Sequence, residues 1–243
     1  MKNPLVSIIV PVLNEEKWLK STLKTIKKQS YRNFEIIVVD NGSKDKSPEI
    51  ALNYADRLLF ESRLGPLFAM HRGFEEARGK IITVCDADTI YPENWLAKMV
   101  KKISENKIIA VYGPMGFRED GAIRRKLIIW GYSFLNGLSN IFGVSLCGAA
   151  NFGMLKEAYF RAGGYMLESK VASQDFILVK KLRKLGKVRF IPSMVCYTSN
   201  RRYTRVNFIH GLKEAFKLWL DVALNRNKIT YDDYYNSNYN NKN

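Results

Sequence analysis

Five short apolar runs separated by helix-like segments are the feature that most constrains the fold. Each run is continuous rather than alternating, which is the pattern of a strand buried on both faces. Such strands, alternating with helices, predict an α/β fold with a mostly parallel central sheet flanked by helices. The runs are Val6–Val10, Phe34–Val39, Leu58–Phe60, Ile81–Cys85 and Ile108–Tyr112.

Helices are expected between and after these runs. Asn14 is a suitable N-cap for the first helix, whose apolar residues recur at helical spacing from Trp18 to Ile26. Pro48 fits the first turn of the second helix. The predicted helices are Lys17–Lys28, a segment starting at Ser47, Leu67–Ala77 and Glu93–Ser104.

Polar residues follow three of the runs. Asn14 and Glu15 follow the first, Asp40 ends the second, and Asp86 and Asp88 follow the fourth. Ligands of open parallel sheets bind beyond the carboxyl ends of the strands. We therefore expect these side chains to meet at one edge of the sheet and to form a binding site there.

Asp86 and Asp88 are spaced to act together. On an extended backbone, residues two apart project to the same side. A pair of hard oxygen ligands at a strand end suits Mg²⁺ or Mn²⁺ shared with substrate phosphates. The alternative is a solvated turn, because Asp-x-Asp is common by chance.

The composition limits the class of protein more than its partners. The 243 residues are 47% hydrophobic and carry a formal net charge of +16, so the chain is long enough for a real core and needs an anionic partner or surface. Nucleic acid, anionic lipid and a phosphate-bearing substrate all fit. The basic runs are Arg124–Lys126, Lys180–Arg189 and Arg201–Arg205.

Several site classes are disfavoured by what the sequence lacks. No G-x-G-x-x-G follows the first run and no G-x-x-x-x-G-K-[ST] occurs, which argues against a dinucleotide-binding Rossmann site and a P-loop. Cys85, Cys147 and Cys196 are far apart, which is typical of a reducing compartment. No signal peptide is recognisable at the start of the sequence.

The second half of the chain has long apolar segments in place of the alternating short runs and helices. Leu127–Cys147 is strongly apolar but is interrupted by Asn, Ser and Gly, so a membrane span is disfavoured. We expect one or two helices there, lying on a membrane surface or lining an acceptor groove, with Arg124–Lys126 near lipid headgroups. Ordinary core helices are the alternative. Phe208–Leu224 is predicted to form a further amphipathic helix. Core packing explains its apolar face at least as often as membrane contact does.

Four ordered segments carry a family resemblance. SIIVPVLNEEKWL, EIIVVDNGSKDKS, RGFEEARGKIITVCDADT and AGGYMLESKVASQDFILVKKLRKLGKV resemble family 2 glycosyltransferases of the GT-A fold. The resemblance covers about Val6 to Arg202. It implies a single catalytic domain over residues 1–230, with a nucleotide-sugar half (5–115), an acceptor half (116–205), an amphipathic helix (206–225) and a poorly ordered tail (231–243).

The resemblance also implies roles for individual residues on the donor side. Pro11, Asn14 and Glu15 match the loop beside the base and ribose, and Asp40 with Gly42 matches the base-reading turn. The family's usual Asp-Asp-Gly-Ser is Asp-Asn-Gly-Ser in this chain. Asp86 matches the acid near the ribose and the metal, and Asp88 the principal metal ligand. Arg63 is a weaker match on the donor side.

The resemblance places the catalytic base at Asp175. Relatives often have Glu-Asp where this chain has Gln174-Asp175, so a neighbouring like charge is absent. A helix N-cap is the alternative role for Asp175. Arg201 and Arg202 resemble a Ser-x-Arg-Arg element and are candidate diphosphate ligands, with a solvated basic turn as the alternative.

The resemblance implies an inverting, metal-dependent hexosyltransferase that uses Mn²⁺ or Mg²⁺ and a UDP- or GDP-type sugar donor. A saccharide, a lipid-linked sugar and a protein all remain candidate acceptors. The expected location is the cytoplasm, with the inner membrane face as an alternative. A nucleotidyltransferase of similar fold is the main competing function. A nucleic-acid-binding protein is disfavoured, since Lys180–Arg189 has only Phe190 at its edge.

Overall fold

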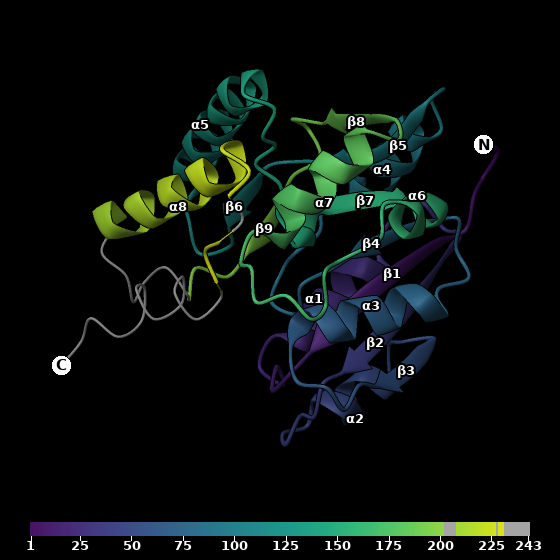
Figure 1. Cartoon of the computed structure of the whole chain (residues 1–243). Coiled ribbons are helices and arrows are strands. Elements are labelled where there is room, and N and C mark those ends of the chain that lie inside the picture. Colours follow the sequence, from purple (N-terminus) through teal and green to yellow (C-terminus); the bar gives the residue numbers. More distant parts are fainter. Residues whose placement is uncertain (202–207, 227, 231–243) are drawn as a thin grey trace.

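The computed structural model describes residues 1–201, 208–226 and 228–230. Its centre is a seven-stranded sheet in the order β3-β2-β1-β4-β7-β5-β8 (Figure 1). The strands are β1 (Val6–Val12), β2 (Phe34–Asp40), β3 (Arg57–Phe60), β4 (Ile81–Val84), β5 (Ile108–Tyr112), β7 (Phe152–Leu155) and β8 (Lys187–Phe190).

Helices cover both faces of this sheet, as the continuous apolar runs predict. Neighbouring residues of β1 belong to opposite cores: Ile8 packs with the core that includes Leu23 and Leu96, and Ile9 with the core that includes Phe74. The helices are α1 (Leu19–Lys27), α2 (Ser47–Leu52), α3 (Pro66–Glu76), α4 (Trp95–Ile103), α6 (Lys156–Arg161) and α7 (Gln174–Arg183).

The prediction of a mostly parallel sheet is confirmed, with one strand running the other way. β1 pairs in parallel with β2 and β4, and β2 with β3. β7 lies antiparallel between β4 and β5. The sequence did not predict β7, because its four residues FGML contain a glycine. That glycine leaves room for the Met99 side chain, whose sulfur would lie 2.3 Å from a Cβ on Gly153.

Two predicted N-caps are wrong. α1 begins after Trp18, not after Asn14, and no side-chain hydrogen bond caps it. Asn14 has a φ of +56° and its side chain binds another loop instead. Ser173, rather than Asp175, precedes α7, and Asp175 lies inside its first turn.

The second half adds a smaller unit at one end of the molecule. A two-stranded parallel sheet joins β6 (Met115–Phe117) to β9 (Cys196–Thr198). The long helix α5 (Ala122–Ile141) and the helix α8 (Phe208–Ala223) lie side by side there (Figure 1), joined by the Trp219 indole N–H, which donates to Ser139 Oγ at 2.6 Å. Within the described residues, no helix has the length and apolar character to cross a bilayer.

Candidate active site

The loops after β1 and β2 are joined by reciprocal hydrogen bonds at the carboxyl edge of the sheet. Asn14 N–H donates to Ser43 Oγ at 2.9 Å, and Asn14 Oδ1 accepts from Lys44 N–H at 2.8 Å. Glu15 N–H donates to Ser47 Oγ at 2.8 Å. Asn14 therefore acts by holding two strand-end loops together, and it fixes the backbone on which Glu15 stands.

Asp40 stabilises the turn that follows β2. Its carboxylate is buried and accepts hydrogen bonds from the N–H groups of Gly42 and Ser43, at 3.2 to 3.3 Å. Gly42 has a φ of +93°, a conformation that glycine adopts without strain. Pro11 lies in β1 opposite Val39, one residue before Asp40. Asp40 and Gly42 thus share one turn, and Pro11 lies beside it on the neighbouring strand.

Asn41 explains the departure from the usual Asp-Asp-Gly-Ser. Its side-chain amide donates to the carbonyls of Glu61 and Arg63, at 2.9 and 2.8 Å, and its Oδ1 accepts from Gly65 N–H at 2.8 Å. An ionised Asp has no N–H with which to make the two donated bonds. Asn41 therefore ties the turn after β2 to the loop between β3 and α3.

Arg63 is engaged by a neighbouring acid. Its guanidinium donates two bonds of 2.9 Å to the Glu61 carboxylate and lies 4.8 Å from the centroid of the Phe68 ring. The bidentate pair lowers the pKa of Glu61 to about 2. In this structure Arg63, which the resemblance assigned to the donor side, is thus paired with Glu61 in the loop between β3 and α3.

Arg201 bridges two predicted site carboxylates. Its Nε lies 3.0 Å from Asp88 Oδ2, and its Nη2 forms an ion pair with Glu15 Oε1. The other Asp88 oxygen lies 3.3 Å from Thr198 Oγ1 at the end of β9. Glu15, Asp88 and Arg201, from three distant parts of the sequence, therefore form one cluster. Arg202 lies outside the described residues.

The residues at this cluster suit a divalent cation that is shared with a ligand. Glu15 Oε2 is buried and has no hydrogen-bond partner in the part of the chain that the structure describes. Across that part, no three His, Cys, Asp or Glu side chains gather as a ready-made metal cluster. A cation held by one or two carboxylates plus phosphate oxygens is the arrangement that Mg²⁺ commonly adopts, so the donor set fits.

Asp86 is connected to the region of Asp175 through a buried tyrosine. Asp86 N–H donates to Tyr91 Oη at 3.1 Å, and Tyr91 O–H donates to the Ala150 carbonyl at 3.0 Å. Ala150 belongs to the 3-10 helix η1 (Ala149–Asn151). The preceding residue, Ala149, donates its N–H to Asp175 Oδ2 at 3.0 Å. These hydrogen bonds fix the loop after β4, η1 and the start of α7 relative to one another.

Asp175 is held from two sides, and its carboxyl group is poorly solvated. Besides the Ala149 bond, Tyr165 O–H donates to Asp175 Oδ1 at 2.8 Å. Burial raises the pKa of Asp175 above its ordinary value, and the bonds from Tyr165 and Ala149 oppose that shift by stabilising the carboxylate. The residue as a whole is half-buried.

Sequence reasoning missed Tyr165, although it stood inside a quoted motif. Gly163 and Gly164 have φ values of +77° and +56°, and a Cβ on Gly164 would lie 2.9 Å from the Tyr159 ring. The Gly-Gly pair therefore makes the turn that delivers Tyr165 to Asp175. The sequence signal that could have identified Tyr165 is its position directly after this Gly-Gly pair.

A second missed feature lies beside Asp88. Arg118, which follows β6, donates to the Asp88 carbonyl at 3.3 Å, and its guanidinium lies 4.7 Å from the centroid of the Trp18 ring. This places a cation and an aromatic ring near the predicted metal ligand. Nothing in the local sequence of Arg118 singles it out, because the contact joins residues about thirty positions apart.

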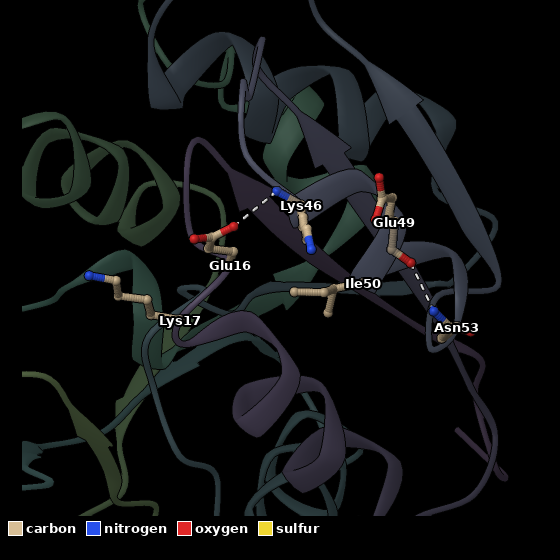
Figure 2. Close-up of a pocket in the computed structure, with 6 residues that line it drawn as sticks. All are labelled: Glu16, Lys17, Lys46, Glu49, Ile50 and Asn53. Atoms are coloured by element: carbon tan, nitrogen blue, oxygen red, sulfur yellow. Dashed lines mark hydrogen bonds between the residues drawn. The ribbon is translucent and has the colours of Figure 1, made fainter.

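A hollow next to the Asn14 loop is separate from this cluster. Figure 2 shows its lining, in which Lys46 N–H donates to Glu16 Oε2 at 3.2 Å and Asn53 donates to the Glu49 carbonyl at 2.9 Å. None of the predicted site residues lines it. Glu16 and Lys46, on its rim, belong to the same two loops that Asn14 joins.

Solved structures share this fold. The mannosyltransferase PcManGT from Pyrobaculum calidifontis, in complex with GDP-Man and Mn²⁺, superposes with a TM-score of 0.71 at 20% identity, covering 95% of this chain and 67% of that chain. Two complexes of glucosyl-3-phosphoglycerate synthase from Mycobacterium tuberculosis with Mn²⁺ and UDP each give a TM-score of 0.61 at 18% identity. They cover 92–93% of this chain and 79–80% of that chain.

Sequence comparison identifies the family. An uncharacterized glycosyltransferase of Haemophilus influenzae is 37% identical over 123 residues, which are 48% of this chain and 49% of that protein. The chain spans between a third and a half of the length of the curated relatives that it matches. The family model described as "Glycosyl transferase family 2" matches residues 7–161. The chain, with its GT-A fold, belongs to glycosyl transferase family 2.

Proposed function

We propose that this protein is an inverting, metal-dependent glycosyltransferase that moves a sugar from a nucleoside-diphosphate sugar to an acceptor hydroxyl. The observation that carries the proposal is the chain of hydrogen bonds from Asp86 N–H through Tyr91 and η1 to Asp175, because it fixes two acidic groups relative to one another. One group is the cluster of Glu15 and Asp88 at the ends of β1 and β4. The other is Asp175, which lies in the first turn of α7 and accepts a hydrogen bond from η1.

The donor's nucleoside would bind over the loops after β1 and β2. Asp40 and Gly42 form a rigid turn there, and the buried, unpartnered Glu15 Oε2 is an acceptor for a hydroxyl such as those of a ribose. The solved relatives complexed with GDP-Man and with UDP support a donor of the GDP or UDP type. A hexose donor is consistent with the mannosyl and glucosyl groups in the names of these two relatives.

Asp88, with Asp86 nearby in the sequence, would hold the divalent cation. Such a cation supplies Lewis-acid stabilisation of the charge that builds on the diphosphate as it leaves. The cation would compete with Arg201 for Asp88 Oδ2. Arg201, once released, is a bidentate donor of the kind that binds phosphate. The two relatives solved with Mn²⁺ support this cofactor.

Asp175 would act as the general base. It takes the proton from the acceptor hydroxyl as that oxygen attacks the anomeric carbon, and inversion follows because the attack comes from the face opposite the diphosphate. Burial keeps the carboxylate poorly solvated, while Tyr165 and Ala149 fix its orientation. The acceptor class stays open between saccharide, lipid-linked sugar and protein.

A product assay tests the proposal against the nucleotidyltransferase alternative. The protein is incubated with UDP- and GDP-hexoses and Mn²⁺, and separately with the nucleoside triphosphates and sugar phosphates. We expect slow release of nucleoside diphosphate from the donor, even with water as acceptor, and no pyrophosphate. Proton NMR of the first sugar released should display the anomer opposite to that of the donor.

Asp88→Asn should abolish this release, whereas Glu157→Gln should not. Glu157 is an exposed acid on α6, paired only with Arg161 among described contacts, and so controls for loss of one negative charge. Pyrophosphate release from a triphosphate would overturn the proposal. Retention of the donor's anomer would overturn the inverting role given to Asp175.

A further inference from the structure

The helix α5 turns its polar side toward the protein. Its two fully buried residues are Asn136 and Ser139. Asn136 Oδ1 accepts from Tyr112 O–H and from Leu146 N–H, each at 3.1 Å. Ser139 Oγ donates to the Val144 carbonyl at 2.8 Å. Hydrogen bonds from these buried polar side chains therefore help to anchor the helix, beside the half-buried Ile129 and Tyr132.

The opposite side of α5 is a continuous stripe of exposed apolar residues. On a helix with 3.6 residues per turn they fall within an arc of about 80°, and they are 45% to 79% exposed. Trp130 and Phe134 stack at its centre, with ring centroids 5.8 Å apart. The α5 stripe consists of Ile123, Leu127, Trp130, Phe134, Leu138 and Ile141.

Exposed basic residues border the stripe. Arg124 and Lys126 project on either side of it at the start of α5. The apolar surface continues at the end of the helix, where the exposed Phe142 ring meets Trp219 of α8 at 5.6 Å. Lys213 and Lys217 of α8 are exposed as well. An apolar stripe with a cationic border is the pattern of an interfacial helix.

We propose that the α5 stripe lies in the headgroup region of an anionic lipid bilayer and holds the protein on the membrane surface. Charge complementarity selects this partner: the border is cationic and the whole chain carries +16. Two copies meeting through this face would bring like charges together, which opposes a dimer. The inference does not depend on the proposed transferase activity.

Vesicle binding tests the proposal directly. The protein is sedimented with vesicles of equal parts phosphatidylglycerol and phosphatidylcholine, and with phosphatidylcholine alone. We expect binding to the anionic vesicles that weakens as salt is raised. The pair Trp130→Ser with Phe134→Ser should lower partitioning by about tenfold or more, which corresponds to ~1.4 kcal/mol. Leu52→Ser is the control, because Leu52 is similarly exposed on α2.

A charge reversal separates the electrostatic contribution. Lys126→Glu should weaken binding to anionic vesicles by about tenfold. Lys101→Glu changes the net charge equally but lies on α4, where Lys101 is exposed, and should have a much smaller effect. Circular dichroism checks that each variant remains folded. The substituted side chains are exposed, so unfolding is not expected.

Three results would overturn the proposal. One is an absence of binding to anionic vesicles. The second is equal binding by the wild type and the Trp130–Phe134 variant. The third is a dimer in sedimentation velocity that the same two substitutions dissociate, which would make the stripe a contact between copies of this chain. Brominated lipids that quench the tryptophan emission of the wild type but not of Trp130→Phe would place Trp130 itself in the bilayer.

Discussion

The sheet edge and the helix α5 use polar and apolar residues in opposite ways. Around β1 to β4, apolar side chains fill the cores and polar ones gather at the strand ends, where Glu15, Asp40 and Asp88 lie. In α5, Asn136 and Ser139 are buried and the large apolar residues are exposed. The first pattern suits the polar donor proposed above, and the second suits the apolar environment proposed for α5.

The largest effect is expected at the sheet-edge site. Asp175→Asn keeps the side chain's size but removes the proton acceptor, so sugar transfer should fall by about 10²- to 10⁴-fold. Thermal shifts with the nucleoside diphosphate should change little, because Asp175 is assigned to the acceptor step. An Asp175→Asn variant with near wild-type turnover would remove this residue from the mechanism.

A matched pair of phenylalanine truncations measures the contrast in stability. Phe74 is fully buried beside Tyr159, with ring centroids 4.7 Å apart, whereas Phe134 is 56% exposed. Phe74→Ala should lower the free energy of unfolding by about 3–5 kcal/mol. Phe134→Ala should change it by only about 0.5 kcal/mol. Urea titration gives both values, and equal losses would mean that the α5 stripe is packed rather than exposed.

The Arg201 bridge predicts competition with a metal ion. Arg201→Gln removes a cation from Asp88 and Glu15, so the affinity for Mn²⁺ alone should rise by about tenfold. Turnover should fall, since the variant also lacks a phosphate ligand. Electron paramagnetic resonance of free Mn²⁺ measures the affinity. Arg161→Gln, which breaks an exposed pair with Glu157, is the control, and unchanged Mn²⁺ affinity in Arg201→Gln would contradict the competition.

The smallest effect concerns pH. The Tyr165 bond lowers the pKa of Asp175, which burial has raised. Tyr165→Phe should therefore raise this pKa further, and the acidic limb of kcat/KM should move to higher pH. A hydrogen bond to a charged group contributes ~1.5–3 kcal/mol, so activity should fall about tenfold on the acidic side and little on the plateau. Tyr31→Phe, which removes a hydroxyl that donates to the Pro4 carbonyl, is the control. An unmoved limb in Tyr165→Phe would argue against the contact.

The sequence predicted the sheet-edge half because its signals are local. A continuous apolar run followed by an acid marks both a buried strand and its ligand-binding end, so β1, β2 and β4 and the positions of Asp40 and Asp88 followed directly. The bridge between Arg201 and Asp88 and the bond between Tyr165 and Asp175 could not be predicted, since folding alone brings these residues together. Arg202, the other candidate diphosphate ligand, lies outside the described residues.

The orientation of α5 was undetermined for a different reason. Helical periodicity identifies a stripe but is the same whether that stripe faces the core or the outside. The alternative of ordinary core helices is wrong for α5, where the stripe from Ile123 to Ile141 is exposed. The orientation is fixed by hydrogen bonds from Tyr112 to Asn136 and from Trp219 to Ser139, whose partners come from segments that only the fold brings near.

The most direct measurement for the central claim is a thermal-shift screen of wild type and Asp88→Asn against UDP, GDP, dTDP and CDP, with Mn²⁺ and with chelator. A ligand at a hundredfold excess over its dissociation constant stabilises the folded state by roughly 2.7 kcal/mol. We predict a Mn²⁺-dependent shift with one diphosphate in the wild type and its loss in Asp88→Asn. A shift that is unchanged by chelator or by the substitution would contradict a metal-dependent donor site at this edge of the sheet.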